Sequence, residues 1–88
     1  RDPLTGLANR RQFELALDRE ADRVARSGEP ALVLMLDIDH FKRVNDELGH
    51  DMGDMVLKET ADVLRRAIRK SDVPCRLGGE EFLVICPG

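Results

Sequence analysis

Two short apolar runs, joined by two glycines and two glutamates, make up the stretch VPCRLGGEEFLVIC from Val73 to Cys86. Short apolar runs separated by such a glycine-containing link are typical of a β-hairpin. A hairpin turn needs only residues that tolerate the turn. The adjacent carboxylates of Glu80 and Glu81 therefore suggest that this turn also holds something.

A second strand is predicted between Ala31 and Asp39, in the sequence ALVLMLDID that follows Pro30. Its apolar residues run on without alternation, which is typical of a strand that is buried on both faces. We therefore expect this strand in the middle of a sheet, with helices packed against it.

Three helices are predicted from apolar residues that recur at helical spacing. The first begins after Asn9, which forms a capping-box pattern with Gln12, and it ends in the segment SGEP, 27–30. Its apolar positions are Phe13, Leu17, Ala21 and Val24.

The second predicted helix is short and is ended by a glycine. Its apolar positions and that glycine are Phe41, Val44, Leu48 and Gly49. The third and strongest helix covers residues 55–69, and Asp51 and Asp54 lie near its start, where acids favour the helix dipole. Its main apolar stripe consists of Leu57, Ala61, Leu64 and Ile68.

Helices packed on a mixed sheet that ends in an antiparallel hairpin define an α/β (α+β) sandwich. The 88 residues are enough for one small domain with a modest core. A hydrophobic fraction of 42% and a charged fraction of 35% are ordinary for a globular protein and exclude a disordered chain. No apolar run approaches the roughly 20 residues that span a bilayer, and no signal peptide is visible.

The net charge of −3, without any basic block, argues against a nucleic-acid groove but not against a single nucleotide held through metal ions. Cys75 and Cys86 flank the predicted turn. Because nothing points to secretion, we expect both to be reduced, half-buried thiols of a cytoplasmic protein. The chain begins at Arg1 rather than at a methionine and stops just after an apolar run, so we expect a piece of a longer protein.

Acidic residues also end the apolar strand, since Asp37 and Asp39 lie there and alternation puts both on one face. If the hairpin pairs beside this strand, Glu80 and Glu81 come near Asp37, and three or four carboxylates converge. Such a cluster repels itself unless protons or cations intervene, and hard divalent cations are its natural partner. One or two carboxylates that share a magnesium ion with substrate phosphates are typical of nucleotide chemistry.

Each part of this pattern also has a purely structural interpretation. The strand-end aspartates can cap the helix that follows, and the paired glutamates can face solvent on an ordinary turn. Gly78 and Gly79 either serve the turn alone or let a phosphate or ribose approach the backbone closely. The combination of an acidic strand end and a glycine-acid hairpin indicates metal-assisted chemistry more strongly than any part does.

The motif GGEEF, from Gly78 to Phe82, resembles the signature of GGDEF domains, the diguanylate cyclases of bacterial signalling. Further motifs resemble that family in order and spacing, and the resemblance covers essentially all 88 residues. These motifs are RDPLTGLANRR from Arg1, DIDHFKRVND from Asp37, GH at Gly49 and GD at Gly53.

This resemblance implies a palm-like (ferredoxin-like) sheet, like that of nucleotide cyclases and polymerases. It also implies a reaction in which two GTP molecules become cyclic di-GMP and two pyrophosphates, with the 3′-hydroxyl of each GTP attacking the α-phosphate of the other. Two domains, each with one GTP, must then meet as a homodimer. The implied cofactor is Mg²⁺ or Mn²⁺. The implied partners are GTP, cyclic di-GMP and an upstream sensory or receiver domain, with no nucleic acid.

The same resemblance assigns roles to single residues. Asp37, the backbone carbonyl of Ile38 and Glu80 correspond to metal ligands. Glu80 also corresponds to the acid that helps to deprotonate the 3′-hydroxyl, and glutamate at this signature position is a common active variant. Glu81 is expected near the metals, and Lys42 corresponds to a lysine that stabilises charge on the phosphates in the transition state.

Asn45 and Asp54 correspond to residues that hydrogen-bond guanine, and an amide with a carboxylate suits the donor-rich edge of that base. His50 corresponds to a third position on the substrate side, and Gly78 and Gly79 belong to the same site. Without the resemblance, Asn45 would be a turn or helix-end residue, Asp54 a first-turn acid, and His50 a loop residue.

Arg69 to Asp72, in the sequence RKSD, corresponds to the RxxD motif of an inhibitory site that binds the product, cyclic di-GMP. There the arginine stacks on or hydrogen-bonds guanine, and the carboxylate completes the contact. The alternative is a pair of residue types that are common just after a helix.

The family's domain is roughly twice this length, so residues 1–88 correspond to the N-terminal part of a single GGDEF domain. We expect the rest of the sheet and a further helix beyond Gly88, and we expect the fragment alone to be inactive. The parent protein is expected in the cytoplasm, and any membrane anchor would belong to a domain outside this chain. The alternative function is a catalytically inactive module that binds cyclic di-GMP or GTP for regulation.

Overall fold

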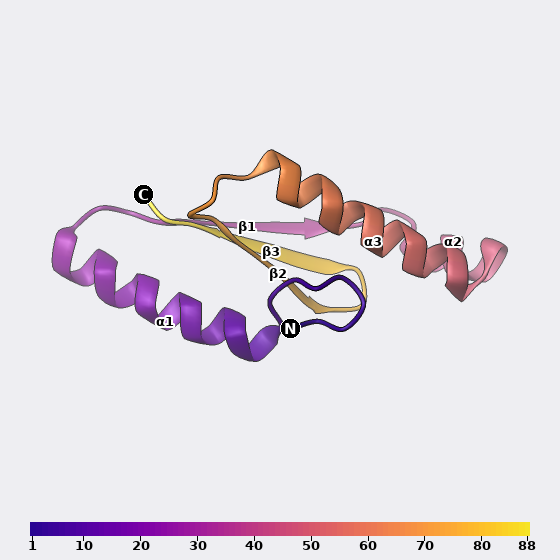
Figure 1. Ribbon diagram of the computed structural model, residues 1–88, viewed down its shortest axis with the longest axis horizontal. Helices are drawn as coiled ribbons and strands as arrows, with labels where there is room; N and C mark the ends of the chain where they lie inside the picture. The colour runs from indigo at the N-terminus through magenta and orange to yellow at the C-terminus, as the bar shows by residue number, and fades with distance from the viewer.

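The computed structural model describes all 88 residues. Its elements follow in the order α1 (Arg10–Ser27), β1 (Leu32–Asp37), α2 (Phe41–Leu48), α3 (His50–Ala67), β2 (Val73–Gly78) and β3 (Glu81–Cys86). The three strands form one sheet in the order β1-β3-β2, and both outer strands pair antiparallel with β3 (Figure 1). The mixed α/β class and the hairpin are confirmed. The sheet is antiparallel, with one isolated parallel bridge between Ala8 and Cys75.

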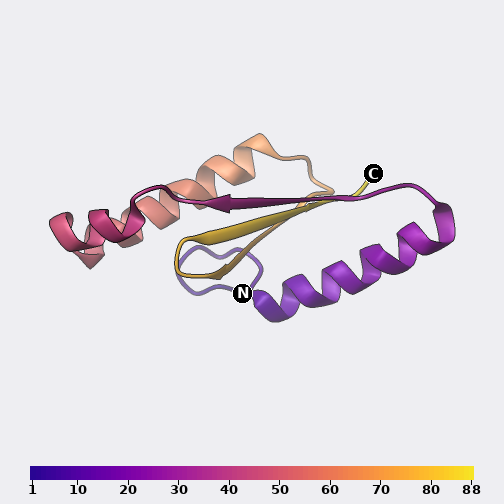
Figure 2. The same ribbon diagram turned by 180° about the vertical axis from the view of Figure 1, so that it is seen from behind.

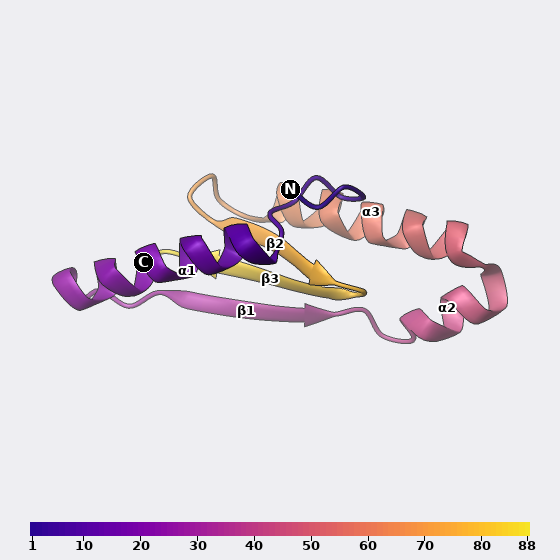
Figure 3. The same ribbon diagram turned by 90° about the horizontal axis from the view of Figure 1, so that it is seen from below.

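The helices pack on opposite faces of the sheet because side chains alternate along β3. One apolar cluster lies on the face of α2 and α3 and consists of Leu7, Phe41, Leu57, Ala61 and Phe82. The other lies on the face of α1 and consists of Phe13, Cys75, Leu83 and Ile85. Figures 1 and 3 show α1 and the α2–α3 pair extending past opposite ends of the sheet, which gives an elongated shape of 49 × 22 × 18 Å.

The predicted central position of the strand at 31–39 is wrong for these residues. β1 is an edge strand that pairs only with β3, and all six of its residues are exposed (Figure 2). β3 occupies the centre instead, and Phe82 and Val84 within it are completely buried. A continuous apolar run shows that both faces of a strand avoid water, but it does not say which strand pairs on both sides.

The first helix forms as the sequence predicts, because its ends are determined locally. The Asn9 side chain accepts a hydrogen bond from the backbone N–H of Gln12 at 2.9 Å, and the Gln12 side chain accepts one from the N–H of Asn9 at 3.0 Å. Gly28 ends the helix in the left-handed conformation, with φ of 75°. The capping box at this helix is therefore confirmed.

The third helix is longer at its start than predicted. α3 begins at His50 rather than at Met55, so Asp51 lies in its first turn and Asp54 lies inside the helix. The helix ends at Ala67, and Ile68 follows it in extended backbone. The predicted stripe is confirmed at its centre, where Leu57 and Ala61 are buried.

The loop before α1 is part of the folded core. Leu7 is 3% exposed and packs in the cluster under α2 and α3. Ala8 lies beside β2, since its N–H donates to the carbonyl of Pro74 at 3.3 Å and its carbonyl accepts from the N–H of Arg76 at 3.0 Å. The loop therefore extends the sheet at its β2 edge.

Both cysteines are free thiols, and the expected half-burial holds for Cys86 but not for Cys75. Cys75 is buried in the core, and this burial raises the pKa of its thiol to about 11. The thiol is therefore protonated at neutral pH and unreactive. None of the helices combines the length and the apolar character that crossing a membrane requires.

Candidate functional site

The hairpin turn lies beside the acidic end of β1, as the sequence predicts. Asp37, the last residue of β1, is directly opposite Glu81, the first residue of β3. Side chains opposite each other on antiparallel strands have Cβ atoms about 4.5–5.5 Å apart. Two carboxylates therefore face each other across the strand pair, and Glu80 precedes them on the turn.

The convergence of three or four carboxylates does not form as expected. No group of three or more histidine, cysteine, aspartate or glutamate side chains lies close enough to hold a metal ion. β1 ends at Asp37, so Asp39 lies in the following turn and strand alternation does not place it on the same face as Asp37. The acidic site therefore consists of the opposed pair Asp37 and Glu81, with Glu80 next to Glu81 on the turn.

The oxygen donors at this place still fit a hard divalent cation. Asp37 and Glu80 supply carboxylates, and the backbone carbonyl of Ile38 follows directly after Asp37. Magnesium usually takes only one or two carboxylates from a protein and fills its other positions with water and substrate phosphates. Two carboxylates and one carbonyl are therefore sufficient, and a third side chain is not required.

The turn itself is tighter than the predicted four-residue link. β2 ends at Gly78 and β3 begins at Glu81, so only Gly79 and Glu80 lie between the strands. The pairing of β2 with β3 shifts register between Arg76 and Gly78. Gly78 and Gly79 have φ of 150° and 50°, and a Cβ placed on either would meet no atom within 4 Å. The space above both glycines is open to a ligand.

The turn after β1 leads directly into α2. His40 precedes this helix in the left-handed conformation with φ of 59°, which is uncommon for a residue other than glycine. Lys42 is exposed in the first turn of α2, close along the chain to Asp37. Its side chain is therefore accessible from solvent.

The corner between α2 and α3 brings together the residues expected to bind guanine. Asn45 lies in α2, His50 begins α3, and Asp54 follows one turn later. Gly49 joins the two helices with φ of 90° and ψ of 163°, and its N–H donates to the carbonyl of Asn45 at 2.9 Å. His50 and Asp54 are exposed, and Asn45 is half-buried.

The two residues of the RxxD motif contact each other. Asp72 accepts a hydrogen bond from the backbone N–H of Arg69 at 2.9 Å, and the two side chains form an ion pair at 3.2 Å. The pKa of Asp72 is lowered, mainly by the hydrogen bond from the backbone N–H of Arg69. Partial desolvation acts in the opposite direction, and the Arg69 guanidinium lowers the pKa further. Arg69 also donates to the carbonyl of Pro87 at 2.8 Å, so the motif lies beside the end of β3.

Sequence reasoning missed a link between the N-terminal loop and the turn. Arg76 donates from Nε to the carbonyl of Gly79 at 3.0 Å and from Nη1 to Asp2 at 3.0 Å. Asp2 also accepts from the backbone and hydroxyl of Thr5 at 2.8 and 2.7 Å. Burial alone would raise the pKa of Asp2, but these hydrogen bonds and the Arg76 charge hold it below its usual value. No local pattern signals a pair separated by 74 residues.

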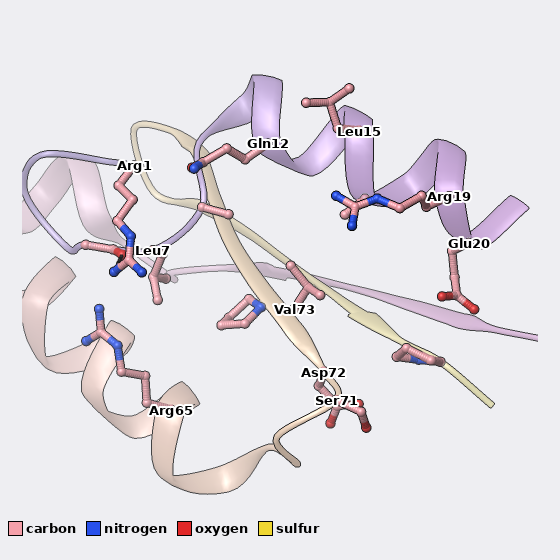
Figure 4. A pocket seen from close by; sticks show the side chains of 15 residues that line it. Arg1, Leu7, Gln12, Leu15, Arg19, Glu20, Arg65, Ser71, Asp72 and Val73 are labelled. Atoms are coloured by element: carbon pink, nitrogen blue, oxygen red, sulfur yellow. Dashed lines mark hydrogen bonds between the residues drawn. The ribbon is translucent and has the colours of Figure 1, made fainter.

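A cavity lies elsewhere, between α1, the N-terminal loop and β2 (Figure 4). It has a volume of about 730 Å³, and Asp72 is the only predicted site residue that lines it. Figure 4 shows the side chains of Arg1 and Arg65 pointing into the same part of this space. The signature turn does not line this cavity, so the cavity is separate from the acidic site.

Comparisons with known proteins agree with the motifs. A family model described as "Diguanylate cyclase, GGDEF domain" matches residues 1–88. The chain is 51% identical over 86 residues to the response regulator PleD of Caulobacter vibrioides, covering 98% of this chain and 19% of that protein. The chain therefore spans only about a fifth of the length of this relative.

Solved structures of GGDEF proteins also resemble this chain in fold and sequence. The diguanylate cyclase SiaD of Pseudomonas aeruginosa, in complex with its activator SiaC, has a TM-score of 0.96 and 49% identity, covering 99% of this chain and 34% of that one. The GGDEF domain of DgcB from Caulobacter crescentus, in complex with c-di-GMP, has a TM-score of 0.93 and 43% identity, with coverages of 98% and 49%. Because the family model matches every residue, the chain belongs to the GGDEF domain family, the family of the diguanylate cyclases.

Proposed function

We propose that this chain is the N-terminal part of a GGDEF domain that condenses two GTP molecules into cyclic di-GMP and two pyrophosphates. The observation that carries the proposal is the placement of Asp37 opposite Glu81, with Glu80 beside them on an open glycine turn. This arrangement offers oxygen ligands and unobstructed space at one end of the sheet. Two domains, each with one GTP, would face each other, so the active unit is a homodimer.

Asp37, Glu80 and the carbonyl of Ile38 would hold Mg²⁺ or Mn²⁺, which neutralises charge on the phosphates when it is bound. Glu80 accepts the proton of the attacking 3′-hydroxyl, and Glu81 adds negative charge beside the ion. Lys42, on the first turn of α2, stabilises charge that develops on the phosphates. Gly78 and Gly79 leave room for the nucleotide to approach the turn.

The helical corner would bind the base of GTP. Asn45 and Asp54 hydrogen-bond guanine, and His50 contacts the substrate from the start of α3. Because this chain spans about half of the DgcB chain, we propose that further residues of a longer protein complete the site and that an upstream domain regulates it. The 88 residues alone are expected to be inactive.

Replacing Glu80 tests this proposal. In the full-length protein, Glu80→Gln should lower cyclic di-GMP formation from GTP and magnesium by about 100-fold or more, because it removes the group that accepts the proton. The matched control is Glu14→Gln, which changes an exposed glutamate on α1. Chromatography of the nucleotide products measures the rate. Turnover that survives Glu80→Gln would show that Glu80 is not the base.

A second candidate is a receptor that binds cyclic di-GMP without turnover. The observation in its favour is the contact between Arg69 and Asp72, which exists without ligand. This site serves both functions, because a cyclase would use it for product inhibition. Cyclic di-GMP binding by the unaltered protein, with no product formed from GTP, would establish the receptor. Product formation that stops in Glu80→Gln while binding persists would establish the enzyme.

A further inference from the structure

Gly53 and the side chain of Asn45 are in direct contact at the corner of α2 and α3. A Cβ built on Gly53 would lie 1.9 Å from Oδ1 of Asn45, 2.9 Å from its Cγ and 3.4 Å from its Nδ2. The first two distances are below van der Waals contact, so no side chain fits at position 53 while Asn45 keeps its place. Gly53 is itself buried.

The backbone does not explain the glycine at this position. The glycines with positive φ are Gly6, Gly28, Gly49, Gly78 and Gly79, and Gly53 is not among them. Gly53 lies inside α3 and donates its N–H to the carbonyl of Gly49 at 3.2 Å, as any helical residue would. Alanine has a higher helix propensity than glycine. The space that Asn45 occupies is therefore the reason that a glycine is needed.

The amide of Asn45 is held in place without using its hydrogen-bonding groups. Its backbone carbonyl accepts from Gly49, and its side chain rests against Gly53. Its Oδ1 and Nδ2 form no hydrogen bond with another residue, although the residue is half-buried. A fixed amide with free donors and acceptors is suited to a ligand that presents both kinds of group.

We propose that Gly53 is a positioning residue for base recognition: its missing side chain fixes the amide of Asn45 in the orientation that reads guanine. The inference rests on the proposed function, because it assumes that Asn45 contacts the base. It adds that selectivity for guanine depends on a residue with no polar side chain. A methyl group at position 53 would rotate the Asn45 amide away and remove its contact with the base.

Nucleotide binding tests the inference in the full-length protein. The probes are 3′-deoxy-GTP and 3′-deoxy-ATP, which lack the attacking hydroxyl and do not react. Gly53→Ala should lower the affinity for 3′-deoxy-GTP by about tenfold, the loss expected for one hydrogen-bonding side chain. The affinity for 3′-deoxy-ATP should stay unchanged. Met52→Ala, one residue earlier on α3, is the matched control and should change neither. Equal weakening of both nucleotides, or none, would overturn the inference.

A double variant separates positioning from general damage. Because Asn45→Ala already removes the amide, adding Gly53→Ala to it should not lower the affinity for 3′-deoxy-GTP any further. If Gly53→Ala alone fails to fold, Asn45→Ala should restore folding, since it clears the occupied space. Independent losses that add in the double variant would show that Gly53 does not act through Asn45.

A measurement without nucleotide distinguishes failure of the inference from failure of the proposed function. The side-chain amide resonances of Asn45 should shift in Gly53→Ala and stay in place in Met52→Ala. Unshifted resonances would overturn the inference regardless of binding. If the resonances shift but Asn45→Ala binds 3′-deoxy-GTP normally, Gly53 positions an amide that does not contact guanine. That result would overturn the proposed role of Asn45, and with it the inference about base recognition.

Discussion

The guanidinium group of Arg76 connects two segments that are distant in sequence. It donates to the carbonyl of Gly79 on the signature turn and to Asp2 in the N-terminal loop. The side chains of Arg76 and Asp2 are only 15% and 12% exposed, so water competes weakly for these bonds. The orientation of the turn is therefore coupled to the loop that precedes α1.

Replacing Asp2 should make stability less dependent on pH. The pKa of Asp2 is lowered in the folded chain, so its ionised form stabilises the fold above the unfolded pKa of about 3.9. This stabilisation is lost as the pH falls through the lower folded value. We expect Asp2→Asn to lower the free energy of unfolding by about 1–2 kcal/mol near neutral pH, and the difference from the unaltered chain should shrink in acid.

Urea unfolding at a series of pH values measures this difference. Asp18→Asn, which changes an exposed carboxylate on α1, is the control and should behave like the unaltered chain at each pH. A difference between Asp2→Asn and the unaltered chain that stays constant from neutral to acid pH would contradict the role of the Asp2 carboxylate.

Local residue patterns were predictable, and distant pairs were not. Asn9 and Gln12 are three residues apart, so their capping box could be identified from helix geometry alone. Arg69 and Asp72 also lie within one turn of chain, but the sequence indicated them only through the RxxD resemblance, and their mutual contact was not predicted. Asp2 and Arg76 meet only because the N-terminal loop pairs with β2, and the contact of Asn45 with Gly53 depends on the angle between two helices.

At the scale of whole elements, β1 and β3 have similar apolar sequences but different surroundings. β3 pairs on both sides and is covered on both faces by the two apolar clusters. β1 has one partner and is exposed along its length. Sequence identified both as strands, but hydrophobicity alone does not determine the order of strands in a sheet. The early start of α3 was missed because residues 50–54 carry no apolar stripe.

This difference predicts that an alanine substitution destabilises the fold much more in β3 than in β1. Val84 in β3 is completely buried, so Val84→Ala should lower the free energy of unfolding by about 2 kcal/mol through lost burial and a cavity. Met35 in β1 is 75% exposed, so Met35→Ala should change it by less than about 0.5 kcal/mol. Urea unfolding at protein concentrations low enough to keep the chain monomeric compares the two variants, and comparable losses there would mean that β1 is covered within the monomer.

At the scale of the whole molecule, the exposed side of β1 continues into an apolar groove along α3. The groove has a volume of about 440 Å³. Its apolar lining residues are Leu36, Met52, Met55, Val56, Val63 and Leu64. The unpaired backbone edge of β1 adjoins this groove, and such an edge pairs readily with another strand. An apolar surface and a free strand edge together favour association with other chains.

We therefore expect the isolated 88-residue chain to self-associate through β1. Sedimentation equilibrium should show a mass that rises with protein concentration. Met35→Lys should reduce this association, because a charge on an edge strand opposes pairing with another edge. Leu15→Lys, which changes a residue on α1 that is 54% exposed, should leave the association unchanged. A single monomeric species at all concentrations, which unfolds cooperatively, would show that the open face of β1 is stable in water. Association that both lysine variants reduce equally would indicate contacts spread over the surface rather than pairing at β1.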